Sequence, residues 1–298
     1  MIQIQLQMFV LIVAGFFFGK KGVIDKNTRK HITDLAVYIL LPCNIFHAFC
    51  SDVSADVIKN SLTVLIISAG VQAAYLLINT FAWNMFPKAQ KAVVKYATIC
   101  NNAGFLGLPV LEAVFGAEGL LYGAVSLIPL RLVMWTAGLS LFTKTDARQT
   151  VRRFAAHPCI WAVILGAAYM LSGITLPGFL LAAINSLSAC VTGVTMLVIG
   201  AILSEVDLKS LVTLKTLYYS FVRLLAIPAI VFAVLTLIKT EKLCLGVSVL
   251  EAAMPAAAIV AMLAEKYDCD SQYASKILFV STALSMITLP MWAYLVNR

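Results

Sequence analysis

Charged residues are scarce in this chain. They make up 12% of its 298 residues, about half of the ~25% usual in soluble domains, whereas 61% are apolar and the mean hydropathy is +0.94. A soluble protein of this length has too little interior to bury so much apolar surface. The composition therefore excludes a soluble enzyme, a disordered chain and a secreted disulfide scaffold, and it predicts an integral membrane protein.

Sequence motifs of catalysis and metal binding are also missing. The seven cysteines are scattered through apolar runs without a CxxC pair, which is typical of small core residues. The chain has no HExxH motif, no paired aspartates within an apolar run and no Ser–His arrangement, and nothing in it predicts the ring of like residues that lines a channel. We therefore expect neither an enzyme nor a channel, and no cofactor or metal. The first apolar run has no basic n-region before it and no small-residue cleavage site, so we expect no cleaved signal peptide.

Ten apolar runs are long enough to cross a bilayer as helices, each of which needs about 20 residues. They cover residues 4–19, 31–50, 58–84, 90–115, 118–143, 157–173, 180–203, 211–238, 243–265 and 272–296. The sequence thus predicts an all-α membrane protein with ten spans and no room for a soluble domain.

The basic residues are distributed unevenly over the loops between these spans. Sixteen of the twenty-two lysines and arginines fall in the odd-numbered loops, and four fall in the even loops and at the carboxyl terminus. Because cytoplasmic loops are enriched in Lys and Arg, the odd loops are expected in the cytoplasm and both termini outside, in a multi-pass protein of the cell membrane. The net charge of +8 therefore reports orientation, and no nucleic-acid partner is expected.

The spans divide into two sets of five. Residues 1–143 form the first set, 144–157 a basic cytoplasmic connecting loop, and 158–298 the second set. Since each set holds an odd number of spans, the second is inserted upside down relative to the first. Inverted repeats of this kind are common in secondary transporters.

The fourth span of each set is interrupted by poor helix formers. Span 4 reads Ile-Cys-Asn-Asn-Ala-Gly-Phe-Leu-Gly-Leu-Pro over residues 99–109, and span 9 reads Leu-Glu-Ala-Ala-Met-Pro-Ala-Ala-Ala over residues 250–258. Matching interruptions point to a transport site. We expect half-helices to start near Pro109 and Pro255, where N–H groups and a partial positive charge would suit an anion. The alternative is a pair of proline kinks that only shape packing.

These motifs resemble the auxin efflux carrier family, which includes bacterial members and the plant PIN-type carriers. The resemblance rests on residues 101–109 and 251–255, on Leu-Pro-Cys-Asn-Ile-Phe-His at 41–47, on Trp-Thr-Ala-Gly at 135–138, on Pro228, and on Ala-Glu-Lys-Tyr at 264–267. It covers the whole chain, because span number, orientation and central loop all agree.

The resemblance implies a fold shared with bile-acid/sodium symporter-like carriers, in which broken helices 4 and 9 cross. It also implies a scaffold of spans 1, 2, 6 and 7, a mobile transport domain of spans 3–5 and 8–10, and a homodimer formed through the scaffold. One position departs from the plant pattern: Asn101 stands where plant members have a proline at the crossover.

Five ionisable residues lie within the predicted spans, where each is costly unless it faces the protein interior: Asp34, Glu112, Arg131, Arg223 and Glu251. Arg131 lies roughly 20 Å from the cytoplasmic interface, which is too deep to reach water. Its planar guanidinium suits a carboxylate, and by resemblance the plant carriers hold substrate with a glutamine at this position. We expect Arg131 to bind substrate, and the alternative is an internal pair with Glu251 or Glu112.

Glu251 stands one turn before Pro255, at the carboxyl end of the outer half-helix. A carboxylate there suits a proton carrier or a cation ligand, and a permanent salt bridge, for instance with Arg131, is the alternative. Arg223 lies eight residues from Lys215, so we expect its side chain to reach the cytoplasmic interface. Glu112 and Asp34 are expected at a cavity mouth or at the membrane interface.

The amides of Asn44, Asn101 and Asn102 can cap broken helices or donate to a carboxylate. We expect these three residues, with Arg131 and Pro255, to bind a small organic anion, and Glu251 to be the coupling residue. The sequence thus predicts a carrier that moves an auxin-like acid or a mono- or dicarboxylate by alternating access of a moving domain. Coupling to a proton or to sodium stays open. A sodium-coupled symporter of organic acids or bile-acid-like substrates is the alternative.

Overall fold

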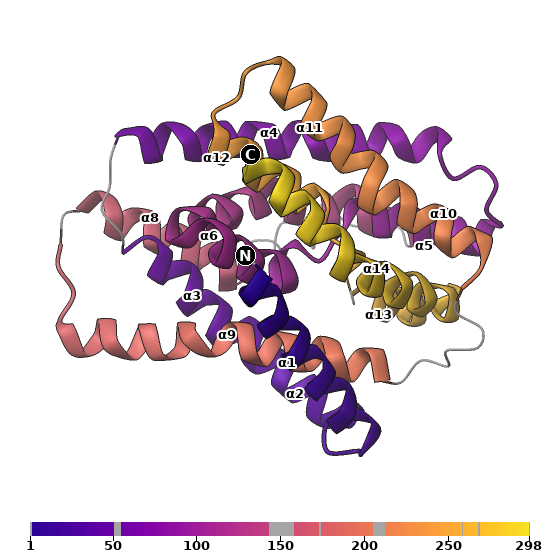
Figure 1. Cartoon of the computed structure of the whole chain (residues 1–298), viewed down its shortest axis with the longest axis horizontal. Coiled ribbons are helices and arrows are strands. Elements are labelled where there is room, and N and C mark those ends of the chain that lie inside the picture. Colours follow the sequence, from indigo (N-terminus) through magenta and orange to yellow (C-terminus); the bar gives the residue numbers. More distant parts are fainter. Residues whose placement is uncertain are drawn as a thin grey trace.

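The computed structural model describes residues 2–50, 55–142, 158–172, 174–204, 212–257, 259–267 and 269–297. Within these ranges the chain is helical, and the extended pairing is a single bridge between Asn101 and Ala256 (Figure 1). Five helices are long and apolar enough to cross a membrane: Asp56–Phe81, Ala103–Val133, Gly178–Ile202, Leu214–Leu237 and Ser271–Asn297. The connecting loop expected at 144–157 lies outside the described residues.

The helices of the first half follow the predicted spans closely. They are α1 (Ile2–Lys20), α2 (Lys26–Leu35), η1 (Ala36–Leu40), α3 (Leu41–Ala48), α4 (Ala55–Phe81), α5 (Lys88–Ile99), η2 (Ala103–Gly107), α6 (Leu108–Val133), η3 (Met134–Gly138) and η4 (Leu139–Leu141). The elements α2, η1 and α3 follow one another without intervening residues, and so do η2, α6, η3 and η4.

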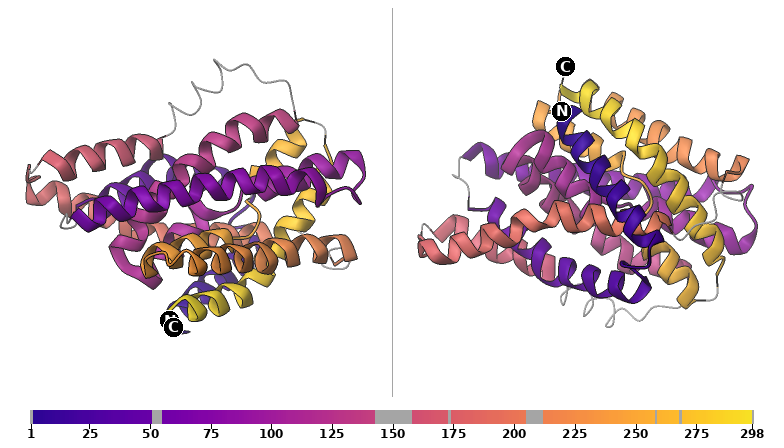
Figure 2. Two further views of the ribbon diagram at one scale, coloured as in Figure 1. Left: turned by 90° about the horizontal axis from the view of Figure 1, so that it is seen from above. Right: turned by 60° about the horizontal axis from the view of Figure 1, so that its bottom comes forward.

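The helices of the second half follow the same pattern. They are α8 (Pro158–Ser172), α9 (Gly178–Ser204), α10 (Leu214–Phe221), η6 (Val222–Ala226), α11 (Ile227–Leu237), α12 (Lys242–Ala252), α13 (Ile259–Lys266) and α14 (Ser271–Asn297). The first and last helices, α1 and α14, contact each other, and the two ends of the chain lie next to each other in both views of Figure 2.

Three of the wide π-type turns end two residues before a proline. The segments η1, η2 and η6 each lead into an α-helix whose second residue is Pro42, Pro109 or Pro228. A proline ring clashes with the carbonyl four residues earlier and leaves it without a donor. A wider turn relieves this conflict, so each helix passes its proline without ending.

A sharp turn at Gly116 divides α6 into the end of span 4 and the beginning of span 5. Its φ of 70° and ψ of −157° belong to a backbone conformation that L side chains rarely adopt. Gly123 lies against the side chains of Leu111 and Leu108, twelve and fifteen residues earlier. A straight helix would separate these residues by about 18 Å or more, so the chain folds back on itself at Gly116.

The helices pack in two groups. In one group α1 crosses α9 over the most extensive contact of the fold, and α3 packs against both α8 and α9. In the other group α4 packs on α6, and α12 contacts α4, α6, α11 and α14. Contacts between the groups are fewer, and those of α3 with α6 are the largest set among them.

Candidate functional site

Two broken helices cross at the centre of the fold. The first helix ends with α5 at Ile99, and helical backbone resumes at Ala103. The second ends with α12 at Ala252, and α13 begins at Ile259. The backbone N–H of Asn102 donates to the carbonyl of Pro255 over 2.8 Å, and that of Ala257 donates to the carbonyl of Cys100 over 3.3 Å. The two unwound segments thus satisfy each other's backbone groups, as irregular chain at membrane depth requires.

The first half-helix starts earlier than the sequence indicated. Helical backbone resumes at Ala103, and Pro109 lies inside the following helix, so the expected start near Pro109 is wrong. Proline is tolerated near the beginning of a helix and after a wide turn, and it therefore marks no break here. The unwinding occurs instead at Cys100, Asn101 and Asn102, where the partner segment supplies hydrogen bonds.

Glu251 lies in the last turn of α12, as predicted, and is buried. Its Oε2 accepts a hydrogen bond from the hydroxyl of Ser126 on α6, and its backbone carbonyl accepts one of 2.6 Å from the side-chain amide of Asn101. The Glu251 carboxylate is therefore bonded to Ser126. Asn101 ties one broken helix to the other.

Arg131 lies on the span 5 part of α6, half-buried, beside η2, where the helix of span 4 restarts. A Cβ placed on Gly104 of η2 would lie 3.4 Å from the Nη2 atom of Arg131, so the guanidinium lies close to the backbone at the start of this helix. Arg131 also lies within electrostatic range of Cys159 on α8, a helix of the other packing group. The guanidinium is thus placed at the boundary between the two groups, next to a helix start.

Arg223 contradicts the expectation that its side chain reaches the cytoplasmic interface. It is completely buried, its Nε donates to the carbonyl of Met254 over 2.9 Å, and its Nη1 donates to the carbonyl of Thr98 over 3.1 Å. The usual helical donor to Thr98 would be the N–H of Asn102, which is directed to Pro255 instead. Arg223 replaces this lost donor and links the ends of α5 and α12, which is why it turns inward.

Asn44 lies outside the crossover, between the two packing groups. Its buried Nδ2 donates to Oε2 of Glu112 on α6 over 3.2 Å and to Oγ of Ser188 on α9 over 2.9 Å. Asn44 therefore joins three helices. The structure brings Asn101, Asn102, Pro255 and Glu251 together and places Arg131 beside η2, whereas Asn44 is held by Glu112.

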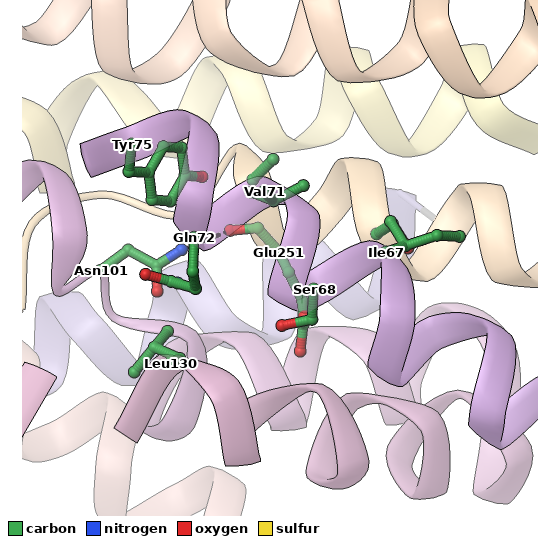
Figure 3. A pocket seen from close by; sticks show the side chains of 10 residues that line it. Ile67, Ser68, Val71, Gln72, Tyr75, Asn101, Leu130 and Glu251 are labelled. Carbon is green, nitrogen blue, oxygen red and sulfur yellow. Dashed lines mark hydrogen bonds between the residues drawn. The ribbon is translucent and has the colours of Figure 1, made fainter. Parts of the chain in front are cut away.

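A small polar cavity opens between α4 and the crossover (Figure 3). Its volume is about 20 Å³, which is room for about one water molecule. Besides Asn101 and Glu251 it is lined by polar residues of α4 and α12 that the sequence analysis missed: Ser68, Gln72, Tyr75 and Ser248. The three on α4 are spaced four and three residues apart, so they share one helix face, and this spacing was the available signal.

Comparisons with known proteins agree with this architecture. A family model described as a membrane transport protein matches residues 1–293. The chain is 26% identical over 294 residues to an uncharacterized transporter of Methanothermobacter thermautotrophicus, with 97% of this chain and 96% of the relative covered. It is 23% identical over 298 residues to the uncharacterized transporter MJ1031 of Methanocaldococcus jannaschii, again covering 97% and 96%. It is 22% identical over 302 residues to the uncharacterized transporter YfdV of Escherichia coli, covering 97% and 95%.

A match over nearly the whole chain settles the family and the general activity. The protein is a multi-pass membrane transporter and not an enzyme, as the sequence predicted. The chain belongs to the membrane transport protein family of auxin efflux carriers.

Proposed function

We propose that this transporter is a secondary carrier of a small organic anion that works by alternating access. Its ten predicted spans form two inverted sets of five, and the interruptions at matching places of the two sets meet in one crossing. A site at such a crossing lies between half-helices, where polar groups are held inside the membrane without facing lipid.

The position of Arg131 carries the proposal of an anionic substrate. An arginine deep in a span supplies a permanent positive charge, and its fork of donors matches the two oxygens of a carboxylate. Beside it begins η2, whose first turn has N–H groups without intrahelical acceptors and the positive end of the helix dipole. A carboxylate is the ligand that both features favour, and Asn102 lies at the same helix start.

The two packing groups support a moving-domain mechanism. Helices α1, α2, α3, α8 and α9 would form the scaffold, and the helices of spans 3–5 and 8–10 would move against it as one body. The crossover is internally bonded by Asn101 and Arg223, which favours its movement as a unit. Contacts from Asn44 to Glu112 lie at the boundary and would have to rearrange in each cycle.

The orientation predicted from the loops places both termini outside the cell membrane. An anion that is exported without a coupled ion is driven outward by the inside-negative membrane potential, at about 2.3 kcal/mol per charge per 100 mV. A homodimer through the scaffold is the expected assembly.

The test is a thermal-shift screen of the purified transporter with monocarboxylates, dicarboxylates, aromatic acids and bile acids. A substrate anion should raise the melting temperature of the wild type, because a ligand that binds the folded state stabilises it. The Arg131→Ala variant should fold and lose this response, whereas Arg29→Ala, a change in α2 near the membrane surface, should keep it. An undiminished shift in Arg131→Ala would refute the anion clamp.

A further inference from the structure

We propose that Asn44 and Glu112 form a latch between the two packing groups, and that the opening of this latch limits the movement of one group against the other. The inference rests on the proposed moving-domain mechanism and names the contact that holds the state seen in the structure. It is tested without substrate, so its outcome is separate from that of the anion site at Arg131.

The latch is built on the side-chain amide of Asn44 in α3. This side chain is completely buried, and its Nδ2 donates two hydrogen bonds. The bond of 2.9 Å goes to Oγ of Ser188 on α9, in the same packing group, and the bond of 3.2 Å goes to Oε2 of Glu112 on α6, in the other group. Ser188 therefore fixes the amide within its own group, and the amide reaches across the boundary to the carboxylate.

Two carboxylates within the spans of the α6 group are bonded in different ways. Glu251 on α12 accepts from Ser126 on α6, so this bond stays inside its group and moves with it. Glu112 is half-buried and accepts from the opposite group. A carboxylate inside a membrane span is costly unless it has a partner, and separation of the groups would take the Asn44 bond from Glu112. This bond therefore favours one arrangement of the groups over another, which is the property that a latch needs.

The latch is strong enough to hold one state and weak enough to open. A hydrogen bond to an ionised carboxylate is stronger than one between neutral groups, and its loss shifts an equilibrium by about tenfold or more. Oδ1 of Asn44 is buried and has no hydrogen-bond partner among the described residues, which disfavours the closed state. Water that enters between separated groups would bond to this oxygen and to the carboxylate of Glu112, and it would thus compensate for the lost contact.

Two native cysteines can report the opening of the boundary. Cys159 on α8 is 3% exposed and lies within electrostatic range of Arg131 on α6, so it is placed where the two groups meet. Cys244 on α12 is completely buried and donates to the carbonyl of Asn60 on α4, inside one group. Separation of the groups should expose Cys159 and leave Cys244 covered. The rate of alkylation of Cys159 then follows the population of the separated state, provided that closing is faster than the reaction.

The experiment measures the alkylation of both cysteines by N-ethylmaleimide in the purified full-length protein, without substrate and below its melting temperature, by mass spectrometry of its peptides. Glu112→Met removes the acceptor and should raise the rate at Cys159 by about tenfold or more, with the rate at Cys244 unchanged. Glu112→Gln keeps an uncharged acceptor and should give a smaller rise. Glu118→Gln, which changes an exposed carboxylate of the same helix, is the matched control and should react like the wild type.

Further variants separate the latch from a general role in packing. Asn44→Leu should raise the rate at Cys159 as Glu112→Met does, and the double variant should match either single variant, because all three lose the same bond. Ser188→Ala removes the acceptor that fixes the amide and should raise the rate several-fold. Together with Glu112→Gln it keeps the test decisive if Glu112→Met does not fold.

Three results would overturn the latch. The first is an equal rate at Cys159 in the wild type and in the folded variants of Glu112. The second is an equal rise at Cys159 and Cys244, which would report general loosening, and the third is a double variant in which the two single effects multiply. If Cys159 reacts in none of the native proteins, the groups do not separate, and the moving-domain mechanism is contradicted together with the latch.

Discussion

The crossing of α1 with α9 and the crossing of the two broken helices bring segments together by opposite means. In the first, glycines remove the side chains: a Cβ on Gly200 would overlap the carbonyl of Ile12, and one on Gly15 would overlap that of Leu197. In the second, the helices unwind, and their backbone groups are bonded by the opposite segment, by Asn101 and by Arg223. The first crossing fixes two helices through apolar contact. The second gathers polar groups inside the membrane, where the proposed anionic substrate would need them.

Arg223→Met should have the largest effect on stability, because it breaks the link at the second crossing. It leaves the carbonyls of Thr98 and Met254 buried without this donor, at about 1–3 kcal/mol each, so the free energy of unfolding should fall by about 2–6 kcal/mol. Thermal or denaturant unfolding followed by tryptophan fluorescence measures the loss. The free energy of unfolding of Arg223→Lys, which keeps the charge without the planar fork, should lie between those of the wild type and Arg223→Met. A variant as stable as the wild type would show that the link is dispensable.

Gly200→Ala should break the first crossing, with the next largest loss. The added methyl group meets the backbone of Ile12 and Phe16, and overpacking of this kind costs about 1–3 kcal/mol. Gly193→Ala is the matched control on α9, since nothing lies within 4 Å of its Cβ position and alanine is the better helix former. The melting temperature should fall in the first variant and stay or rise in the second. The same change in both would contradict the close approach of the helices.

Asn101→Pro should have the smallest effect on stability, and it tests the contribution of the side-chain amide of Asn101. The bridge uses the N–H of Asn102 and the carbonyl of Cys100, and Cys100, at φ −104° and ψ 89°, lies outside the α region that a following proline disfavours. The variant should lose about 1 kcal/mol, the value of the hydrogen bond to Glu251. A loss comparable to that of Arg223→Met would mean that the backbone of Asn101 is itself required.

The positions of the helices could be predicted from the sequence because the length of an apolar run is a local property. The charge of each loop is local too, and it supports the predicted orientation. The interruptions of spans 4 and 9 were also predictable, since both runs contain poor helix formers at matching places, whereas their crossing was expected only from the family resemblance. The role of Arg223 was not, because its partners Thr98 and Met254 belong to distant segments and become acceptors only when both helices unwind. Distance from Lys215 along the chain carries no information about which way the side chain turns.

The residues of α4 were missed for a related reason. Ser68, Gln72 and Tyr75 are individually ordinary in a membrane helix, and their common face becomes meaningful only when Glu251 and Asn101 lie opposite. Pro109 was overinterpreted, because a proline interrupts a helix only where no wide turn precedes it.

The central claim, an anion carrier built around Arg131, is tested most directly by flux in proteoliposomes. An anion found in the thermal-shift screen is loaded inside, and its exchange is followed for the wild type, Arg131→Ala and Arg29→Ala under an imposed membrane potential. The account predicts potential-dependent exchange by the wild type and Arg29→Ala, and none above background by a folded Arg131→Ala. Exchange by Arg131→Ala at the wild-type rate would contradict it.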